Sequence, residues 1–167
     1  MLHPNNIVTF FDHMDSKFVK HVAKFRPWLR NIDLNQSGAS EKDVVMLLKS
    51  CKQLHPKDIK GGCKGDLYCE AVTSLYPDLE EIEITGANTT EIGLITLLKG
   101  CPGMHPNGIT ATESTSTKYR PVPKGDLFLE AVVKLRPDIT EISLEPGCGS
   151  LSDKGLAALV SDFDIQP

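Results

Sequence analysis

The sequence has 167 residues, of which 40% are apolar and 24% are charged, and its formal charge is −4. This length and composition are typical of one folded domain, and the negative charge disfavours general binding to nucleic acids or anionic membranes. No run approaches the roughly 18 apolar residues of a membrane-spanning helix, and we expect no signal peptide at the start. The predicted location is cytoplasmic, with neither membrane nor nucleic acid among the partners.

An internal repeat organises the whole chain. With a shift of 50 residues, Leu47–Ile59 (LLKSCKQLHPKDI) aligns with Leu97–Ile109 (LLKGCPGMHPNGI). With a shift of 60, Lys64–Ile84 aligns with Lys124–Leu144. Each long repeat divides again into two halves, and each half combines an extended segment with a helix. The pattern predicts a single domain of six units with a usual period of about 25 residues, at 2–28, 29–53, 54–78, 79–103, 104–138 and 139–167.

Extended segments and helices alternate along these units. In the first unit, residues 2–7 are extended and a helix begins at about Ser16. In the second, spaced apolar residues predict a strand at Leu29–Leu34, and Ser40 with Asp43 resembles a capping box before the next helix. Three prolines favour short or irregular strands in the odd-numbered units, because proline donates no hydrogen bond to a sheet: Pro4, Pro56 and Pro106.

Two aspartates have matching positions in the third and fifth units. Asp66 and Asp126 each follow a glycine in the two copies of Lys-Gly-Asp. We expect both to be N-cap residues, since a short side-chain acceptor binds the free amides of a first helical turn.

The fifth unit contains an insertion at 110–123 that is rich in Ser and Thr, and it is predicted to be a flexible surface loop.

The spacing Leu79-x-x-Ile82-x-Ile84, followed by an apolar helix, resembles the leucine-rich repeats. The segments TTEIGLITLLKGCPGM and LSDKGLAALVSDF resemble the cysteine-containing and ribonuclease-inhibitor-like branches, and the resemblance extends over essentially the whole chain. It implies an α/β solenoid with a curved parallel β-sheet on the concave face and helices on the convex face. The expected core includes Phe18, Phe25, Leu75, Ile82, Ile84 and Leu156.

The chain has five cysteines, an odd number. Cys51 and Cys101 share one repeat position two units apart, which places them about 10 Å from each other in such a sheet, too far for a disulfide. We expect free, buried thiols in a reducing compartment. The spacing of the cysteines does not indicate a zinc site, and no metal or cofactor is expected.

The side chains between the apolar positions would project from the concave face. The candidate partner-binding residues on that face are Arg30, Asp33, His55, Asp58, Glu80, Glu81, Glu83, His105, Thr140, Glu141, Ser143 and Glu145. Their many carboxylates favour a partner with a basic patch. Trp28, between two arginines, is interpreted either as a buried wedge or as an exposed anchor for a partner.

Histidine precedes proline at the same place in alternate units, at His3, His55 and His105. Side chains that are separated by a whole strand cannot share a metal ion, because zinc needs every ligand within about 2 Å. We expect these histidines to hydrogen-bond neighbouring strand ends or carboxylates, with a pH-sensitive binding face as the alternative.

The sequence contains no recognised nucleophile, phosphate-binding or metalloprotease motif. The predicted function is therefore a non-catalytic protein–protein interaction module, or scaffold, that binds through an acidic concave face. Two alternatives remain. One is a regulator of an enzyme, either an inhibitor or a GTPase activator for which Arg30 or Asn31 would be needed, and the other is a substrate-recognition subunit in ubiquitin ligation. An uncapped end of the repeat array also leaves a homodimer open.

Overall fold

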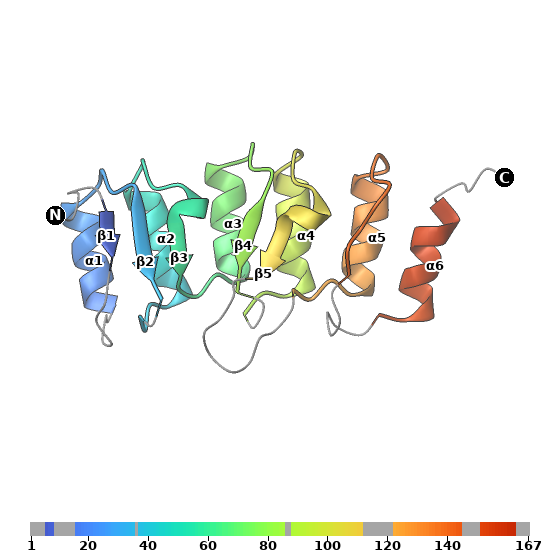
Figure 1. Cartoon of the computed structure of the whole chain (residues 1–167), viewed down its shortest axis with the longest axis horizontal. Coiled ribbons are helices and arrows are strands. Elements are labelled where there is room, and N and C mark those ends of the chain that lie inside the picture. Colours follow the sequence, from blue (N-terminus) through green and yellow to red (C-terminus); the bar gives the residue numbers. More distant parts are fainter. Residues whose placement is uncertain are drawn as a thin grey trace.

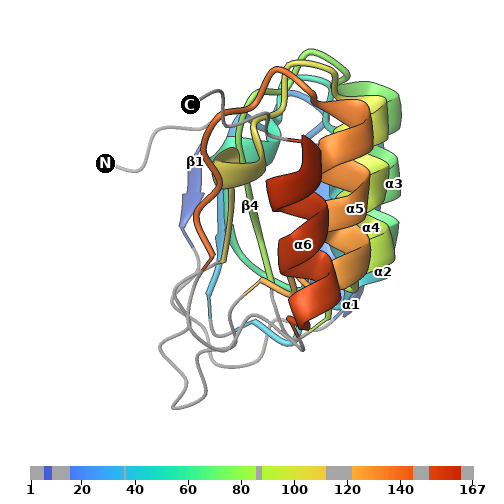
Figure 2. The ribbon, with the colours of Figure 1, turned by 90° about the vertical axis from the view of Figure 1, so that its right-hand side faces the viewer.

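The computed structural model describes residues 6–8, 16–35, 37–85, 88–111, 122–144 and 151–162. This part of the chain contains six helices. They stand side by side in one row, and short strands lie along one side of the row (Figure 1; Figure 2). Each helix contacts the next one in the sequence. The helices are α1 (Ser16–Phe25), α2 (Glu41–Ser50), α3 (Asp66–Leu75), α4 (Glu91–Gly100), α5 (Asp126–Leu135) and α6 (Asp153–Asp162).

The strands form two separate parallel sheets. The first has the order β1-β2-β3 and the second pairs β4 with β5. In both sheets an isoleucine of one strand faces an isoleucine of the next, as Ile32 faces Ile59 and Ile82 faces Ile109. The strands are β1 (Asn6–Val8), β2 (Asn31–Leu34), β3 (Ile59–Gly61), β4 (Ile82–Ile84) and β5 (Ile109–Ala111), with 3₁₀ turns η1 (Pro56–Asp58) and η2 (Pro106–Gly108) before β3 and β5.

The expected leucine-rich-repeat solenoid with one curved sheet is therefore wrong. Among the described residues, helices dominate, and two short sheets replace a continuous one. Between the two sheets, hydrogen bonds from Thr85 to the carbonyl oxygens of Lys64 and Gly62 take the place of a strand ladder. The chain turns out of β3 at Gly61 and Gly62, both of which have a positive φ, of 66° and 74°, that other residues rarely adopt. We call the side that carries the strands the strand face and the opposite side the helix face.

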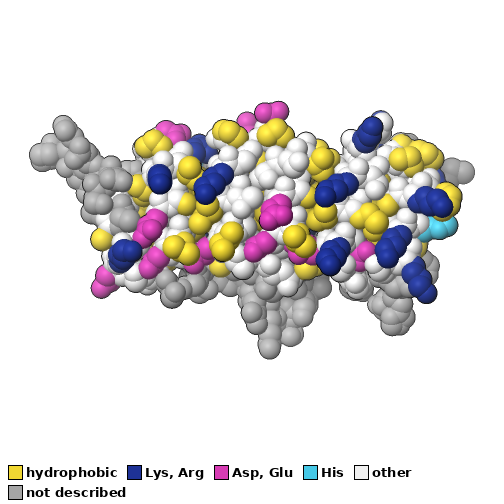
Figure 3. Space-filling view, turned by 180° about the vertical axis from the view of Figure 1, so that it is seen from behind, with side chains coloured by type: hydrophobic (Ala, Val, Ile, Leu, Met, Phe, Trp, Pro, Cys, Tyr) yellow, Lys and Arg dark blue, Asp and Glu magenta, His cyan; other side chains and the backbone are white. Residues whose placement is uncertain are grey.

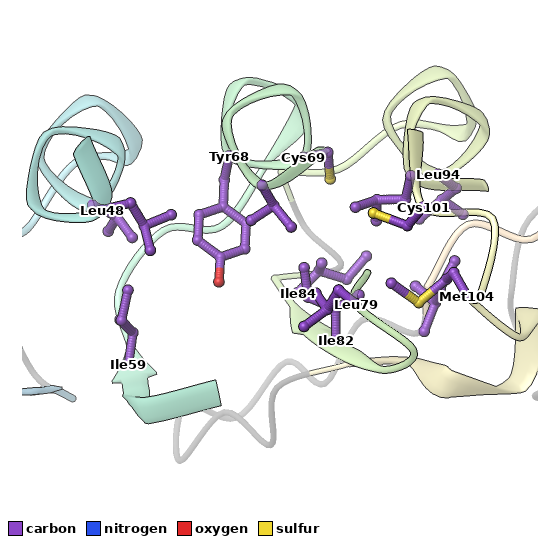
Figure 4. Close-up of a cluster of buried hydrophobic side chains, with 14 of the residues drawn as sticks. Leu48, Ile59, Tyr68, Cys69, Leu79, Ile82, Ile84, Leu94, Cys101 and Met104 are labelled. Carbon is purple, nitrogen blue, oxygen red and sulfur yellow. The ribbon is translucent and has the colours of Figure 1, made fainter. Parts of the chain in front are cut away.

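The core lies between the helix row and the strands. The even spacing of apolar residues in β4 directs Ile82 and Ile84 inward, where they are buried. Figure 4 shows Tyr68 reaching from α3 toward the strand layer, with Leu48 of α2 on one side and Ile84 on the other. Four residues that were expected in the core are instead 37–50% exposed, so the apolar spacing of their helices did not determine their burial: Phe18, Phe25, Leu75 and Leu156.

The capping box predicted before α2 is confirmed. The Ser40 hydroxyl accepts a hydrogen bond from the backbone of Asp43, and the Asp43 carboxylate accepts one from the backbone of Ser40. Asp66 and Asp126, in contrast, are not N-cap residues, because Gly65 and Gly125 occupy those positions. Each aspartate is the first residue of its helix, and its side chain is directed to the following helix.

The two aspartates hold the N-caps of the helices that follow them. Asp66 accepts hydrogen bonds from the backbone nitrogen and hydroxyl of Thr90, at 2.8 and 2.7 Å. Asp126 does the same with Ser152, at 2.9 and 2.5 Å, and these bonds hold the pKa of the Asp126 carboxyl below its ordinary value. The first-turn carboxylate of one helix therefore fixes the beginning of the next.

Three of the four described cysteines are buried, as expected from the sequence, and Cys63 is partly exposed. Cys51, Cys63, Cys69 and Cys101 are free, and all but Cys63 are fully buried. The thiols of Cys51 and Cys101 donate to the carbonyl oxygens of Arg26 and Tyr76, at 3.4 and 3.5 Å. The repeat thus uses a thiol at the end of a helix to hold the end of the preceding helix. Cys148, most of the insertion and the first His-Pro pair lie outside the described residues.

Candidate binding groove on the strand face

Two matched His-Pro turns stand on the strand face. His55 precedes η1, and its Nδ1 accepts a hydrogen bond from the backbone nitrogen of Lys57 at 3.3 Å. His105 precedes η2 and accepts in the same way from Asn107 at 3.1 Å. Each side chain therefore caps its own turn rather than a neighbouring strand end. Because Nδ1 accepts, the proton of the neutral ring is on Nε2, which remains a donor.

A groove of about 730 Å³ lies between the two turns. Glu80 and Glu81 line it, and His105 donates its backbone N–H to the Glu80 carbonyl at 3.4 Å. A side chain at Gly108 would place its Cβ 2.7 Å from that carbonyl, so glycine permits the close approach. The lining residues are His55, Lys57, Leu75, Tyr76, Pro77, Asp78, Leu79, Glu80, Glu81, Gly103, His105 and Gly108.

The groove is acidic. Asp78, Glu80 and Glu81 are exposed along it, and Lys57 is the one Lys or Arg among its lining residues. The pKa of His55 lies below its usual value because burial disfavours the charged ring and Lys57 repels it, although Asp58 acts in the opposite direction. His55 is therefore mainly neutral at pH 7 and does not cancel the carboxylates.

Tyr76 supports one wall of the groove. Its ring meets the ring of His55 edge-on, with centroids 5.3 Å apart, and its hydroxyl donates to the Leu54 carbonyl at 2.7 Å. Arg136 has the equivalent repeat position and binds the Met104 carbonyl instead. Tyr76 and Asp78 were not among the predicted site residues. In the sequence they flank Pro77, where the chain leaves α3 and continues to Glu80 and Glu81, and this position could have indicated them.

The structure brings together four of the predicted site residues, namely His55, Glu80, Glu81 and His105. Others have partners elsewhere. Glu83 lies 3.7 Å from the buried ammonium of Lys64, and Arg30 donates to the side chain of Gln53 at 3.1 Å. Asp58 is half-buried on η1, and Asp33 accepts a hydrogen bond from the backbone of Asn35. Three further predicted residues are exposed and do not line the groove: Thr140, Glu141 and Ser143. Glu145 lies outside the described residues.

Trp28 is exposed rather than buried. Its side chain is 46% exposed, and the guanidinium of Arg26 lies 6.0 Å from the centre of the ring. The interpretation as a buried wedge is therefore wrong. The exposed Trp–Arg pair lies just after α1, at the end of the row far from α6 (Figure 1).

Within the described ranges, no three His, Cys, Asp or Glu side chains are grouped so that they could hold a metal ion. None of the described helices combines the length and apolar character that a bilayer span requires. No family model matches this chain, and no curated protein matches it either, so the resemblance to leucine-rich repeats depends on the sequence pattern alone.

Proposed function

We propose that this chain is a non-catalytic protein-binding module that holds a basic segment of a partner protein in the strand-face groove. The observation that carries the proposal is the row of exposed carboxylates, Asp78, Glu80 and Glu81, in a groove between two histidine turns. A Lys or Arg side chain of the partner would lie against Glu80 and Glu81. Opposite charge steers such a segment toward the groove and sets its register more than it adds raw affinity.

The two histidines supply the complementary contacts. In both rings Nδ1 is already bonded to a backbone amide, which leaves Nε2–H as a donor at each end of the groove. An extended peptide offers backbone carbonyl oxygens as acceptors, so His55 and His105 would bind the main chain while the carboxylates bind side chains. The edge of Tyr76 and the apolar part of Leu75 supply contact area between them.

The partner-binding residues that we propose are thus His55, Asp78, Glu80, Glu81 and His105. Glu83 is not among them, because its carboxylate is held by Lys64. A reducing compartment is supported by the free thiols of Cys51 and Cys101, which donate to backbone carbonyls, and we propose the cytoplasm.

The test is a binding measurement with a defined probe. A fluorescent peptide in which arginine alternates with glycine is titrated with the wild-type chain, and its anisotropy is followed at low salt. We expect Glu80→Lys/Glu81→Lys to weaken binding by roughly tenfold or more, because both contacts become repulsive. The matching peptide with glutamate in place of arginine should not bind the wild-type chain.

A matched variant separates the groove from net charge. Glu70→Lys/Glu130→Lys changes two exposed carboxylates on α3 and α5 and shifts the formal charge by the same amount. We expect this control to bind the arginine peptide within about twofold of the wild type, apart from general screening effects. Equal losses in both double variants would mean that the peptide responds only to net charge. An absence of binding by the wild type would overturn the proposal directly.

A further inference from the structure

Two lining residues of the strand-face groove, Lys57 and Glu80, have the same repeat position. Each lies two residues before the isoleucine that begins its strand, β3 or β4. Arg30 has this position in the preceding unit, because the isoleucine two residues after it pairs with the first isoleucine of β3 in parallel register. In the repeat, the line of side chains that crosses the groove therefore continues to Arg30, on the α1 side.

A second line of side chains lies two residues earlier in each unit. His55 and Asp78 have this position in the groove, and Trp28 has it in the preceding unit. Trp28 is 46% exposed, and Asp78 and Asp138 are exposed at the same position, so this place in the repeat is open to solvent. A large aromatic side chain at such an open position is typical of a binding anchor.

Side-chain contacts join these residues to the groove. Arg30 donates to the side chain of Gln53 at 3.1 Å, and Gln53 stands two residues before His55 of the groove wall. On the other side, the guanidinium of Arg26 lies 6.0 Å from the centre of the Trp28 ring. We call Arg26, Trp28, Arg30 and Gln53 the tryptophan patch. It adjoins the His55 end of the groove.

The charge changes sign between the tryptophan patch and the far end of the groove. The exposed charged residues of segments 26–30 and 52–57 are all basic: Arg26, Arg30, Lys52 and Lys57. Those of segment 78–81 are all acidic: Asp78, Glu80 and Glu81. Asp58 follows Lys57 directly, but it is half-buried and offsets only part of the positive charge. The surface is therefore basic at one end and acidic at the other.

The helix face shows no such division. Basic side chains lie toward both ends of the row there, with acidic side chains between them (Figure 3). The separation of charge is therefore a property of the strand-face edge and not of the whole molecule. Complementary charges set the register of a bound segment, so a ligand that covers this edge needs its own charges separated in the same way.

We propose that the partner segment is bipolar, with a basic part in the groove and an acidic part on the tryptophan patch. This inference rests on the proposed function and adds the polarity and the spacing of the ligand. Neighbouring strands lie about 5 Å apart, so two units place Arg30 at least about 10 Å from Glu80. An extended peptide covers about 3.3 Å per residue, so roughly three or four residues separate its acidic part from its basic part.

The test compares a reference peptide with two bipolar peptides, none of which contains tryptophan. The reference peptide is the arginine–glycine peptide with an uncharged arm at each end. In the bipolar peptides glutamates replace one arm, either before or after the arginines, beyond a spacer of about four uncharged residues. We expect one of the two to bind the wild-type chain roughly fivefold or more tightly than the reference peptide does. A response to net charge alone has the opposite sign, because the chain and the added glutamates are both negative.

Trp28 reports directly on the patch, since it is the only tryptophan in the chain. The tighter bipolar peptide should change its fluorescence emission at saturation, whereas the reference peptide should not. Arg30→Glu should abolish the preference for the bipolar peptide and should bind the reference peptide at least as tightly as the wild type, which also shows that the variant is folded. Lys99→Glu is the matched control, because it makes the same change of charge at an exposed position of α4, and it should keep the preference.

The outcomes separate this inference from the proposed function. If the reference peptide binds but neither bipolar peptide binds more tightly, the role of the tryptophan patch is overturned and the proposed function stands. The same holds if Trp28 emission does not respond, if the preference persists in Arg30→Glu, or if Lys99→Glu loses it equally. If the reference peptide does not bind the wild type, the proposed function fails, and this inference fails with it.

Discussion

The carboxylate of Asp66 accepts two hydrogen bonds from Thr90, one from the backbone nitrogen and one from the hydroxyl, at 2.8 and 2.7 Å. Asp66 begins α3, and Thr90 is the N-cap of α4. The bond pair therefore links the beginnings of two adjacent helices that are 24 residues apart in the chain. The residue that caps the first turn of α4 is thus held in place by the preceding helix.

Replacement of Asp66 by alanine should lower the free energy of unfolding by about 1–2 kcal/mol, because two hydrogen bonds to a charged acceptor are lost and the Thr90 amide is left without this partner. Urea denaturation followed by circular dichroism measures the change. The control is Glu70→Ala, an exposed carboxylate in the same helix, which should change stability by less than about 0.5 kcal/mol. Equal effects of both substitutions would contradict the linking role of Asp66.

Replacement of Gly93 by alanine should destabilise the protein, although the same change inside an ordinary helix stabilises by up to about 1 kcal/mol. The added Cβ would lie 2.2 Å from the Asp66 Oδ1 atom, so the carboxylate would have to leave Thr90. Thermal denaturation should show a lower Tm. At Gly103 the nearest atom would be 3.6 Å away, an ordinary contact, and Gly103→Ala should leave the Tm nearly unchanged. A higher Tm for Gly93→Ala would show that the two helices have room to separate.

Lys64 and Glu83 form an ion pair, and replacing one or the other should change the free energy of unfolding by different amounts. Lys64 is buried, and its Nζ donates to the Ile59 carbonyl at 2.7 Å and lies 3.7 Å from Glu83. Burial lowers the pKa of Lys64, and Glu83 only partly opposes this effect. Lys64→Met removes the buried charge and should change the unfolding free energy by less than about 1 kcal/mol.

Glu83→Gln leaves the buried ammonium of Lys64 without its counter-charge. It should therefore lower the free energy of unfolding by about 1 kcal/mol more than Lys64→Met does. The difference is modest because Glu83 is itself partly exposed to water. Urea denaturation of both variants at pH 7 gives the comparison. In the double variant, the cost of Glu83→Gln should disappear, because no buried charge remains. A larger loss for Lys64→Met than for Glu83→Gln would show that the bond to Ile59 matters more than the charge.

The contribution of Asp43 should depend on pH. Burial by itself raises the pKa of this carboxyl, but hydrogen bonds from Ser16 and Ser40 and the charge of Lys20 together outweigh burial, and the pKa lies below 3.8. The unfolded chain therefore takes up the proton first as pH falls. The stability that Asp43 contributes is fully present above about pH 5 and is lost as the pH falls from 3.8 through the lower pKa of the folded state.

Unfolding free energies of the wild type and Asp43→Asn, measured from pH 7 down to pH 3, test this sign. The difference between them should be constant near neutral pH and should shrink below pH 4. Ser16→Ala keeps the carboxylate but removes its shortest hydrogen bond, at 2.5 Å, so its pH dependence should lie between those of the other two. A difference that grows on acidification would show that burial, rather than hydrogen bonding, decides this pKa.

The sequence predicted an element correctly where the interactions that form it lie within one short stretch of the chain. The capping box of Ser40 and Asp43 occurs as predicted, and β2 begins at Asn31 within the predicted strand Leu29–Leu34. The irregular positions predicted at Pro56 and Pro106 are confirmed, since both His-Pro pairs open 3₁₀ turns before their strands. In each case the deciding contacts lie within a few residues along the chain.

Predictions failed where a contact between units decides the outcome. Asp66 was expected to cap its own helix, yet its carboxylate reaches Thr90 in the next unit. The continuous sheet was implied by the resemblance to leucine-rich repeats, but the turn at Gly61 and Gly62 ends β3, and two hydrogen bonds from the backbone and hydroxyl of Thr85 stand in place of a ladder. Glu83 is no longer among the proposed site residues for the same reason, because its carboxylate lies against Lys64 in the folded chain.

The sequence by itself determined the repeat, its six helices and the order of extended segments between them, because the spacing of apolar residues and the capping residues act over one or two helical turns. Only the tertiary structure decided which of those apolar residues are covered. Phe18 and Tyr68 have the same place in their helices, yet Phe18 is 37% exposed and Tyr68 is fully buried, since burial depends on everything that packs around a position in the folded chain. It also decided that His55, Glu80 and His105, from three different units, line one groove.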